Sequence, residues 1–263
     1  MKKNYVLFFD SGLGGISTLK EALSLYKTNY IYFGDTLHSP YGNHSKKEIC
    51  LYLKQIILDL QKKYCIKIVV LACNTATTSA IKFLRKTFPE ITFIGTEPAI
   101  NLAKKNGYNK ILTIATPTTI KQKKFKLLVK SLNIKHKNLP LEHFATKIEN
   151  YFNEKTIFNN FELIKEIYKI KKVSKNYESL VLGCTHYCLI KSKIKHYINK
   201  PIFDGNFGTA KMLVSKIEKL YSKEFKSKTK ATIKLIISSK NPAQTQKYTK
   251  ILKQILAINY KMW

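Results

Sequence analysis

The feature that most constrains the fold is a series of short apolar runs in which polar residues do not alternate. IKIVVLA at 66–72 and SLVLG at 179–183 are two of them. Strands have this composition when both of their faces are buried, as in a parallel sheet covered by helices on either side. The sequence predicts strands at 5–9, 30–33, 66–72, 91–95, 110–115, 179–183, 201–203 and 232–238.

Stretches with helical character separate these runs. The predicted helices lie near 14–26, 45–63, 76–87, 97–106, 118–132, 158–172, 189–198, 207–222 and 241–257. The alternation of strand and helix favours an α/β fold with right-handed crossovers, in which ligands bind outside the carboxyl ends of the strands. Polar residues gather after five predicted strands, at Asp10-Ser11, Gly34-Asp35, Cys73-Asn74-Thr75, Thr116 with Thr118, and Cys184-Thr185-His186.

Two of these clusters have a cysteine directly after an apolar run, in VVLACNTATT (69–78) and LVLGCTHYCL (180–189). The chain has 263 residues, and at roughly 150 residues per domain this length predicts about two domains. The repeated corner and the length together favour two similar α/β domains, each of which supplies one cysteine to a shared cleft.

The five cysteines have several alternative interpretations. Cys50 lies in a helical pattern and Cys65 in a predicted loop before a strand, and both fit the role of small buried hydrophobes. Cys184 and Cys188, with His186 between them, have ligand chemistry suited to zinc. A structural zinc site usually needs four ligands in paired short spacings, and the sequence has no second pair. We therefore predict no metal site.

Composition indicates a globular protein of a reducing compartment. Hydrophobic residues make up 44% of the chain, which is enough for a sizeable core. The apolar stretch 5–9 is too short for a signal peptide, and no apolar run reaches the ~18 residues that span a bilayer. Cysteines that are odd in number and widely spread favour free thiols. We expect a cytoplasmic protein with no membrane partner.

The formal charge of +31 raises the alternative of a non-catalytic protein that binds polyanions. All but one of the 47 basic residues are Lys, the exception being Arg85. Proteins that read bases or clamp phosphates favour Arg, whose planar fork makes bidentate contacts. The lysines are spread over every predicted helix, which is typical of solvated helix faces. We predict no specific nucleic-acid partner and only weak, salt-sensitive association with polyanions.

A thiol at the start of a helix is suited to proton transfer. The helix dipole and the free backbone N–H groups stabilise a thiolate and lower a pKa that starts at about 8.5. Ser11, Asn74, Thr75 and Thr185 add short hydrogen-bonding groups at the same predicted sheet edge. Two thiols among groups that bind carboxylates suit proton abstraction from a carbon next to a carboxylate, and two bases on opposite faces would permit inversion.

Seven segments in order resemble the motif series of the bacterial glutamate racemases, within the wider aspartate/glutamate racemase superfamily. The resemblance extends from about residue 5 to about 211, and the closing segment after residue 232 is also similar. The segments are FFDSGLGGISTLKEA (8–22), YFGDTLHSPYGNHS (32–45), LACNTATTSAI (71–81), GTEPAI (95–100), ATPTT (115–119), LGCTHYCLI (182–190) and FDGNFGTA (203–210).

The resemblance implies a cofactor-independent transfer of the α proton by two cysteines, which interconverts L- and D-glutamate. Cys73 would deprotonate the D-enantiomer and Cys184 the L-enantiomer, with Asp10 assisting Cys73 and His186 assisting Cys184. From the residues alone, Asp10 fits equally a helix cap and His186 a surface histidine. The groups implied to bind the substrate are Asp10, Ser11, Tyr41, Gly42, Asn74, Thr75, Thr118, Thr185 and His186.

The sequence departs from the family pattern at three places. Cys188 stands where the family usually has Pro, and Gly205 where it usually has Ser. The family's second acidic helper falls in a poorly matched segment, LPLEHFATKIENY. We assign it to Glu149, with Glu142 as the alternative.

The resemblance also implies the architecture and the partners. It predicts two flavodoxin-like, doubly wound domains with the active site in the cleft between them: 1–97 with 208–263 on the Cys73 side, and 98–207 on the Cys184 side. The substrate would be a small molecule, the product would supply peptidoglycan synthesis, and the family allows a homodimer. An aspartate or broader amino-acid racemase is the alternative enzyme.

Overall fold

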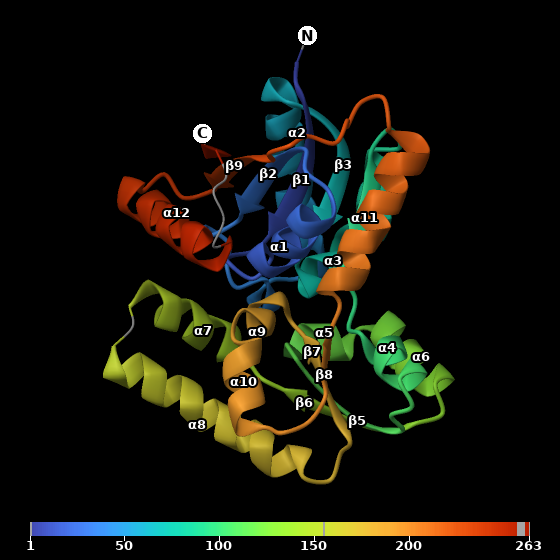
Figure 1. The fold of residues 1–263 in the computed structure, drawn as a ribbon, viewed down its shortest axis with the longest axis vertical. Coiled ribbons are helices and arrows are strands. Elements are labelled where there is room, and N and C mark those ends of the chain that lie inside the picture. The colour runs from blue at the N-terminus through green and yellow to red at the C-terminus, as the bar shows by residue number, and fades with distance from the viewer. Residues whose placement is uncertain (1, 155, 257–260, 263) are drawn as a thin grey trace. The chain divides into compact units, whose positions relative to one another are not determined.

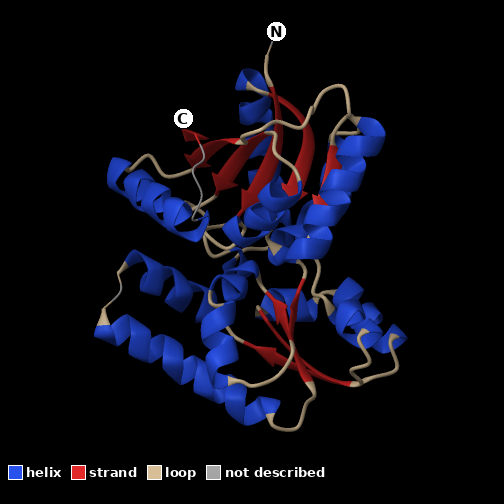
Figure 2. Ribbon diagram, viewed as in Figure 1, coloured by secondary structure: helices blue, strands red, loops and turns tan. Residues whose placement is uncertain are grey.

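The computed structural model describes residues 2–154, 156–256 and 261–262. The chain forms two compact units, one from Met1–Thr96 with Asn206–Trp263 and one from Glu97–Gly205. Each unit is a parallel sheet with helices packed on it, so the predicted α/β fold with two parallel-sheet domains is confirmed (Figure 2). No helix in the described ranges has the length and apolar character needed to cross a membrane.

The first unit contains a six-stranded parallel sheet with strand order β10-β9-β2-β1-β3-β4 (Figure 1). Its strands are β1 (Asn4–Asp10), β2 (Asn29–Gly34), β3 (Cys65–Leu71), β4 (Thr92–Gly95), β9 (Thr232–Ile237) and β10 (Lys261–Met262). Its helices are α1 (Ile16–Leu25), the 3-10 turn η1 (Tyr41–Asn43), α2 (Lys46–Lys63), α3 (Asn74–Thr87), α11 (Asn206–Leu220) and α12 (Pro242–Leu256).

The core of this unit explains why its strands lack alternation. Residues on one face of β1 and β3, such as Leu7 and Val69, pack with Leu53 of α2 and Leu84 of α3. The opposite face is buried as well, because α1 lies beside α11 and α12 there, and Phe8 is fully covered. Strands with both faces buried leave their polar residues to the strand ends, where the candidate site residues lie.

The second unit contains a four-stranded parallel sheet with strand order β6-β5-β7-β8. Its strands are β5 (Lys110–Ala115), β6 (Lys135–Pro140), β7 (Ser179–Gly183) and β8 (Ile202–Asp204). Its helices are α4 (Ile100–Lys105), α5 (Pro117–Lys121), α6 (Lys123–Ser131), α7 (Phe144–Asn153), α8 (Ile157–Ser174), α9 (Thr185–Leu189) and α10 (Lys191–Tyr197).

Two helical layers cover the two faces of this smaller sheet. Leu112 and Leu180 face a cluster that includes Ile148 of α7 and Ile167 of α8. Ile111 faces the other layer, which α4 and α6 form. The thicker layer, with α7, α8, α9 and α10, is the one that surrounds Cys184.

The structure corrects several element predictions. Cys65 is not in a loop, because it begins β3 and pairs with Asn4 of β1. The predicted helix 118–132 is broken at Gln122, whose backbone is extended. Residue 257, the predicted end of the last helix, lies outside the described residues. Cys50 is buried within α2, as the helical pattern predicts.

The predictions for the second unit omit β6 and α7, and the predicted helix 189–198 includes only the last residue of α9. β6 is an edge strand of polar sequence, KHKNLP, whose residues are half-buried or exposed, so it has no apolar run to identify it. No element is predicted at 144–153, where α7 forms without a capping side chain at His143. This omission matters for the site because α7 contains Glu149.

Candidate functional site

Cys73 caps the helix α3 at the carboxyl edge of the first sheet. β3 ends at Leu71, and two residues later the Cys73 Sγ accepts a hydrogen bond from the Ala76 N–H at 3.4 Å. The Ser11 hydroxyl lies 3.6 Å from the same sulfur, and only 7% of Cys73 is exposed. The sulfur therefore lies at the positive end of the α3 dipole, where a thiolate is stabilised.

Asp10 ends β1 and is fully buried. Its Oδ1 accepts a hydrogen bond from the Gly12 N–H at 2.9 Å. The loop folds tightly over this carboxyl group, since a Cβ at Gly15 would lie 2.8 Å from the Cβ of Asp10. The residue before α1 is Gly15, and the Gly12 N–H that Asp10 binds lies in the loop that precedes this helix.

Tyr41 lies in the turn η1 and is almost fully buried. Its hydroxyl donates a 2.6 Å hydrogen bond to the Asp35 Oδ2. Burial raises the pKa of the Tyr41 phenol well above its ordinary value, and the negative charges of Asp35, Cys73 and Asp10 raise it further. The phenol is therefore a permanent proton donor that shares an electrostatic environment with both catalytic candidates of this unit.

Sequence reasoning assigned no role to Asp35 or His38. Asp35 is fully buried at the end of β2, and its oxygens lie 2.9 and 3.0 Å from the His38 Nδ1. The His38 ring stacks on Tyr52 at 3.8 Å between centroids. Both side chains lie within six residues of Asp35 in GDTLHSPYG, but this spacing does not show that they share one carboxylate.

The remaining candidates of the first unit lie beside Cys73 or in η1. Asn74 and Thr75, the first two residues of α3, are both about 4% exposed. The Asn74 amide donates to the Thr96 carbonyl at 3.5 Å, which is a long hydrogen bond. Gly42 is exposed in the turn η1.

Cys184 occupies the equivalent corner of the second unit. β7 ends at Gly183, α9 begins at Thr185, and Cys184 lies between them with an extended backbone. A Cβ at Gly183 would lie 2.8 Å from the Ala115 Cβ, so this close strand contact requires glycine. The Cys184 Sγ is 3.9 Å from the His186 Nδ1, and 7% of the residue is exposed.

His186 links Cys184 to a carboxylate. Its Nε2 lies 2.7 Å from the Glu149 Oε1, and the imidazole is 5% exposed, so the surface-histidine alternative is wrong. Burial alone would lower the pKa of His186. The hydrogen bonds and negative charges of Cys184 and Glu149 outweigh burial and raise that pKa well above its ordinary value. The geometry therefore favours an imidazolium between the sulfur and the carboxylate.

The structure distinguishes the two acidic candidates. Glu149 extends from α7 to His186, and 18% of its side chain is exposed. Glu142 is 73% exposed and lies 3.9 Å from His143, itself an exposed residue. Glu149, and not Glu142, is the acidic residue in contact with His186.

Thr185, Thr118, Cys188 and Gly205 complete the predicted set. Thr185 is 2% exposed and begins α9, whereas Thr118 is half-buried in α5, which Thr116 caps. The Cys188 thiol donates to the Cys184 carbonyl at 3.6 Å, so it contacts the backbone of the corner. Gly205 directly precedes α11. Among the described residues, no group of three or more His, Cys, Asp or Glu side chains is arranged to hold a metal ion.

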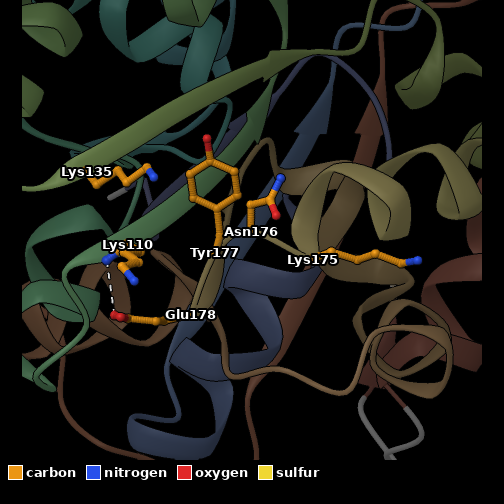
Figure 3. Close-up of a pocket in the computed structure, with 6 residues that line it drawn as sticks. All are labelled: Lys110, Lys135, Lys175, Asn176, Tyr177 and Glu178. Atoms are coloured by element: carbon orange, nitrogen blue, oxygen red, sulfur yellow. Dashed lines mark hydrogen bonds between the residues drawn. The ribbon is translucent and has the colours of Figure 1, made fainter.

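A cavity of about 380 Å³ lies at the opposite, amino-terminal edge of the second sheet (Figure 3). Lys110 and Lys135 begin β5 and β6, and Glu178 immediately precedes β7. Glu178 is held there by the backbone N–H groups of Asn109 and Lys110, which lower its pKa. Since Cys184 follows the other end of β7, this cavity is not part of the candidate site.

Comparisons with known proteins agree with the geometry. The sequence profile of the Asp/Glu/Hydantoin racemase family matches residues 19–213. A glutamate racemase of Clostridium botulinum is 40% identical over 225 residues, which cover 82% of this chain and 85% of that protein. A glutamate racemase of Clostridium novyi is 36% identical over 257 residues, covering 95% and 96% of the two chains.

Solved structures show the same fold. Escherichia coli glutamate racemase, in complex with L-glutamate and the activator UDP-MurNAc-Ala, superposes with a TM-score of 0.81. The superposition covers 99% of this chain and 97% of the other, at 23% sequence identity. At that identity the likeness concerns the arrangement of the elements.

Proposed function

The chain belongs to the Asp/Glu/Hydantoin racemase family, and on that premise we propose that it interconverts L- and D-glutamate. The choice of glutamate rests on relatives of 35–40% identity that are themselves glutamate racemases. The observation that carries the proposal is the pair of corners. Cys73 and Cys184 each follow a buried parallel strand, precede a helix, and are 7% exposed.

In the proposed reaction one thiolate removes the α proton and the other thiol delivers a proton to the opposite face of the same carbon. The electron pair of the broken C–H bond remains on the α carbon and its carboxylate until the second proton arrives, so the reaction needs no cofactor. Cys73 acts on D-glutamate and Cys184 on L-glutamate. Each turnover leaves the two sulfurs with their protonation states exchanged.

Charged groups beside Cys184 support its proposed role in proton transfer. An imidazolium at His186 stabilises the Cys184 thiolate and can return a proton to it, because the ring nitrogen lies 3.9 Å from the sulfur. Glu149 stabilises the imidazolium from the other side at 2.7 Å. At the first corner the Ala76 N–H and the Ser11 hydroxyl stabilise the sulfur, and we propose that Asp10 exchanges the proton.

The carbanion-like transition state needs stabilisation from fixed hydrogen-bond donors. We propose that the substrate carboxylates and ammonium are bound by side chains and backbone groups at the two corners and in η1. Buried donors are effective here because they do not have to reorganise during the reaction. The proposed groups are Asp10, Ser11, Tyr41, Gly42, Asn74, Thr75, Thr118, Thr185 and His186.

The cellular role follows from the product. We propose that the protein is cytoplasmic and supplies D-glutamate for peptidoglycan synthesis, with a small molecule as its substrate and no specific nucleic acid as partner. The high lysine content is a surface property in this proposal, and the candidate site does not depend on it.

The test is incubation of purified protein, free of pyridoxal phosphate and treated with chelator, with L-glutamate in D₂O. Loss of the Cα–H signal by NMR and appearance of D-glutamate by chiral chromatography are followed together. Deuterium entry coupled to inversion is expected, and its loss in both Cys73→Ser and Cys184→Ser supports the two-thiol mechanism. Exchange with aspartate but not with glutamate would identify aspartate as the substrate. No exchange with either amino acid would overturn the proposal.

A further inference from the structure

The helix α8 has an exposed face that contains only two kinds of residue. Its buried face, with Leu163, Ile167 and Ile170, packs against the core of the second unit. Figure 1 shows the helix at an outer edge of that unit, beside α7 and α10. Within α8, all of which the structure describes, every exposed residue is either apolar or a lysine. We name this set the α8 face: Ile157, Phe158, Phe161, Lys165, Tyr168, Lys169, Lys171 and Lys172.

The apolar residues of the α8 face are large and extend far into the solvent. Ile157 is 91% exposed, Phe158 70%, Phe161 60% and Tyr168 52%. Single exposed apolar residues are common on globular proteins, whereas several neighbouring ones on one helix mark an interaction surface. The Lys171 Nζ lies 5.6 Å from the centroid of the Tyr168 ring, so the apolar residues and the lysines form one continuous surface.

The charge on the α8 face is positive, because the acidic residues of the helix do not belong to it. Glu162 and Glu166 are partly buried, and both form ion pairs with Lys147 of α7. Two lysines of the α8 face, Lys165 and Lys169, also approach these carboxylates, at 3.9 and 3.0 Å. The negative charge of α8 is therefore paired at the contact with α7, whereas its exposed face contains lysines and no acid.

A helix face of aromatic residues and lysines is complementary to the surface of an anionic bilayer. Apolar side chains enter the boundary between headgroups and acyl chains, while lysines extend their charged ends to the phosphates. The α8 face covers about 160° of the helix circumference, which suits a flat surface better than the narrow seam between two helices. The formal charge of +31 attracts the whole chain to such a surface. We propose that the α8 face attaches the protein to the surface of membranes that contain anionic lipids.

This attachment is peripheral and leaves the candidate site apart. The apolar residues of the α8 face are interrupted by charged residues along the sequence, so they form no run long enough to span a bilayer, and hydropathy does not predict this partner. The corner with Cys184 belongs to the cluster on the buried side of α8. We therefore expect attachment to leave racemisation unchanged, and the proposal does not depend on the proposed reaction.

Flotation of the full chain with phospholipid vesicles tests the proposal, at low and at high NaCl. The protein is expected to bind phosphatidylcholine vesicles only when they contain phosphatidylglycerol, and more weakly at high salt. The double variant Phe158→Ser/Phe161→Ser is expected to bind about 10-fold more weakly, because it removes the inserted aromatic side chains. The matched control is Leu102→Ser/Leu127→Ser, which removes two exposed apolar side chains from α4 and α6 at unchanged net charge and is expected to bind like the wild type.

Insertion is measured with a tryptophan placed in the α8 face. The fluorescence of Phe161→Trp, after subtraction of the signal of the chain's single native tryptophan, is expected to shift to the blue with anionic vesicles and to be quenched by brominated lipid. Leu127→Trp is the control and is expected to show neither change.

Three results would overturn the proposal. Equal binding of the two double variants would mean that the protein attaches by net charge alone. No binding to anionic vesicles is the result expected if an acidic protein, and not a membrane, covers the α8 face. Equal signals from Phe161→Trp and Leu127→Trp would mean that the α8 face is not the part that enters the bilayer. None of these readouts depends on racemase activity.

Discussion

The corners at Cys73 and Cys184 share a backbone arrangement and differ in the groups around the sulfur. Cys73 accepts a hydrogen bond from the backbone N–H of Ala76 and has a hydroxyl, Ser11, as its neighbour. Cys184 has no side-chain cap bond to its short helix and instead has His186 at 3.9 Å, backed by Glu149. The Cys73 sulfur lies against a helix terminus, whereas the Cys184 sulfur lies against a charged pair of side chains, His186 and Glu149.

In the proposed reaction, the same strand–helix corner is equipped for proton exchange in two different ways. α3 has 14 residues and a full set of N-terminal N–H groups, so its dipole acts on Cys73. α9 has five residues, too few to develop the same dipole. An imidazolium supplies the missing positive charge at Cys184. The two thiols are therefore expected to respond differently to pH and to substitution.

The largest expected effect is the loss of either sulfur. Cys73→Ser and Cys184→Ser each replace a thiol by a hydroxyl that is not ionised near neutral pH, so we expect racemisation to fall by at least about 10³-fold in both. Chiral chromatography from each enantiomer measures it. Activity close to that of the wild type in one of the two variants would show that only one corner takes part in proton transfer. The two corners would then not be a pair of acid/base groups.

Substitutions of His186 and Glu149 test the difference between the two corners, because both residues lie at the Cys184 corner. His186→Asn is expected to lower kcat by about 10²-fold, since it removes the charge next to Cys184, and Glu149→Gln by about 10-fold, since the imidazole remains. Both effects are expected to be larger with L-glutamate. Glu142→Gln is the control, because Glu142 is exposed and away from His186, and it is expected to leave both directions unchanged. Unchanged kinetics of Glu149→Gln in both directions would remove Glu149 from the mechanism.

The same pair predicts a pH-dependent stability difference. The pKa of His186 is raised in the folded protein, so its protonated form stabilises the fold. This contribution is fully present below the unfolded pKa of about 6.5 and is lost as pH rises through the raised folded value. Urea unfolding is therefore expected to show Glu149→Gln less stable than wild type at acidic pH, with the gap closing in alkali. A gap independent of pH would show that Glu149 does not stabilise an imidazolium.

Tyr41 is expected to have a smaller effect, confined to the first corner. Tyr41→Phe removes the hydroxyl that donates a 2.6 Å hydrogen bond to the Asp35 Oδ2. The buried carboxylate then loses this donor. We expect the free energy of unfolding to fall by about 1–3 kcal/mol. Combining Tyr41→Phe with Asp35→Asn in a double-mutant cycle measures the coupling, and strictly additive effects would show that the bond contributes nothing.

How much of this could be predicted from the sequence differs between the two corners. Cys73, Asp10 and Ser11 follow continuous apolar strands, so the pattern alone places them at one sheet edge, and the strands themselves were predicted. The contact between His186 and Glu149 could not be predicted physically, because it depends on α7, a helix that periodicity missed, and on packing over a separation of 37 residues. Glu149 was preferred to Glu142 only by resemblance.

The Asp35–Tyr41–His38 group was missed for a related reason. Its three residues were visible as polar positions after β2, but nothing in the spacing shows that one buried carboxylate accepts from both side chains. The edge strand β6 was missed because edge strands do not need apolar residues on both faces. Patterns identify elements with a buried stripe, and they do not identify partners that tertiary packing brings together.

The smallest expected effect concerns Cys188, where this chain departs from the family. Its thiol donates to the Cys184 carbonyl, a backbone contact one turn along α9, and it is only half-buried. Cys188→Ala keeps the helix and removes the thiol, so we expect kcat to change by less than about twofold in both directions.

After mild peroxide treatment, however, the Cys188→Ala variant is expected to retain more activity than the wild type, because a second thiol near Cys184 offers a partner for disulfide formation. Equal loss in both proteins would show that Cys188 has no part in oxidation, and a large loss of kcat without oxidant would show that the Cys184 corner needs this thiol.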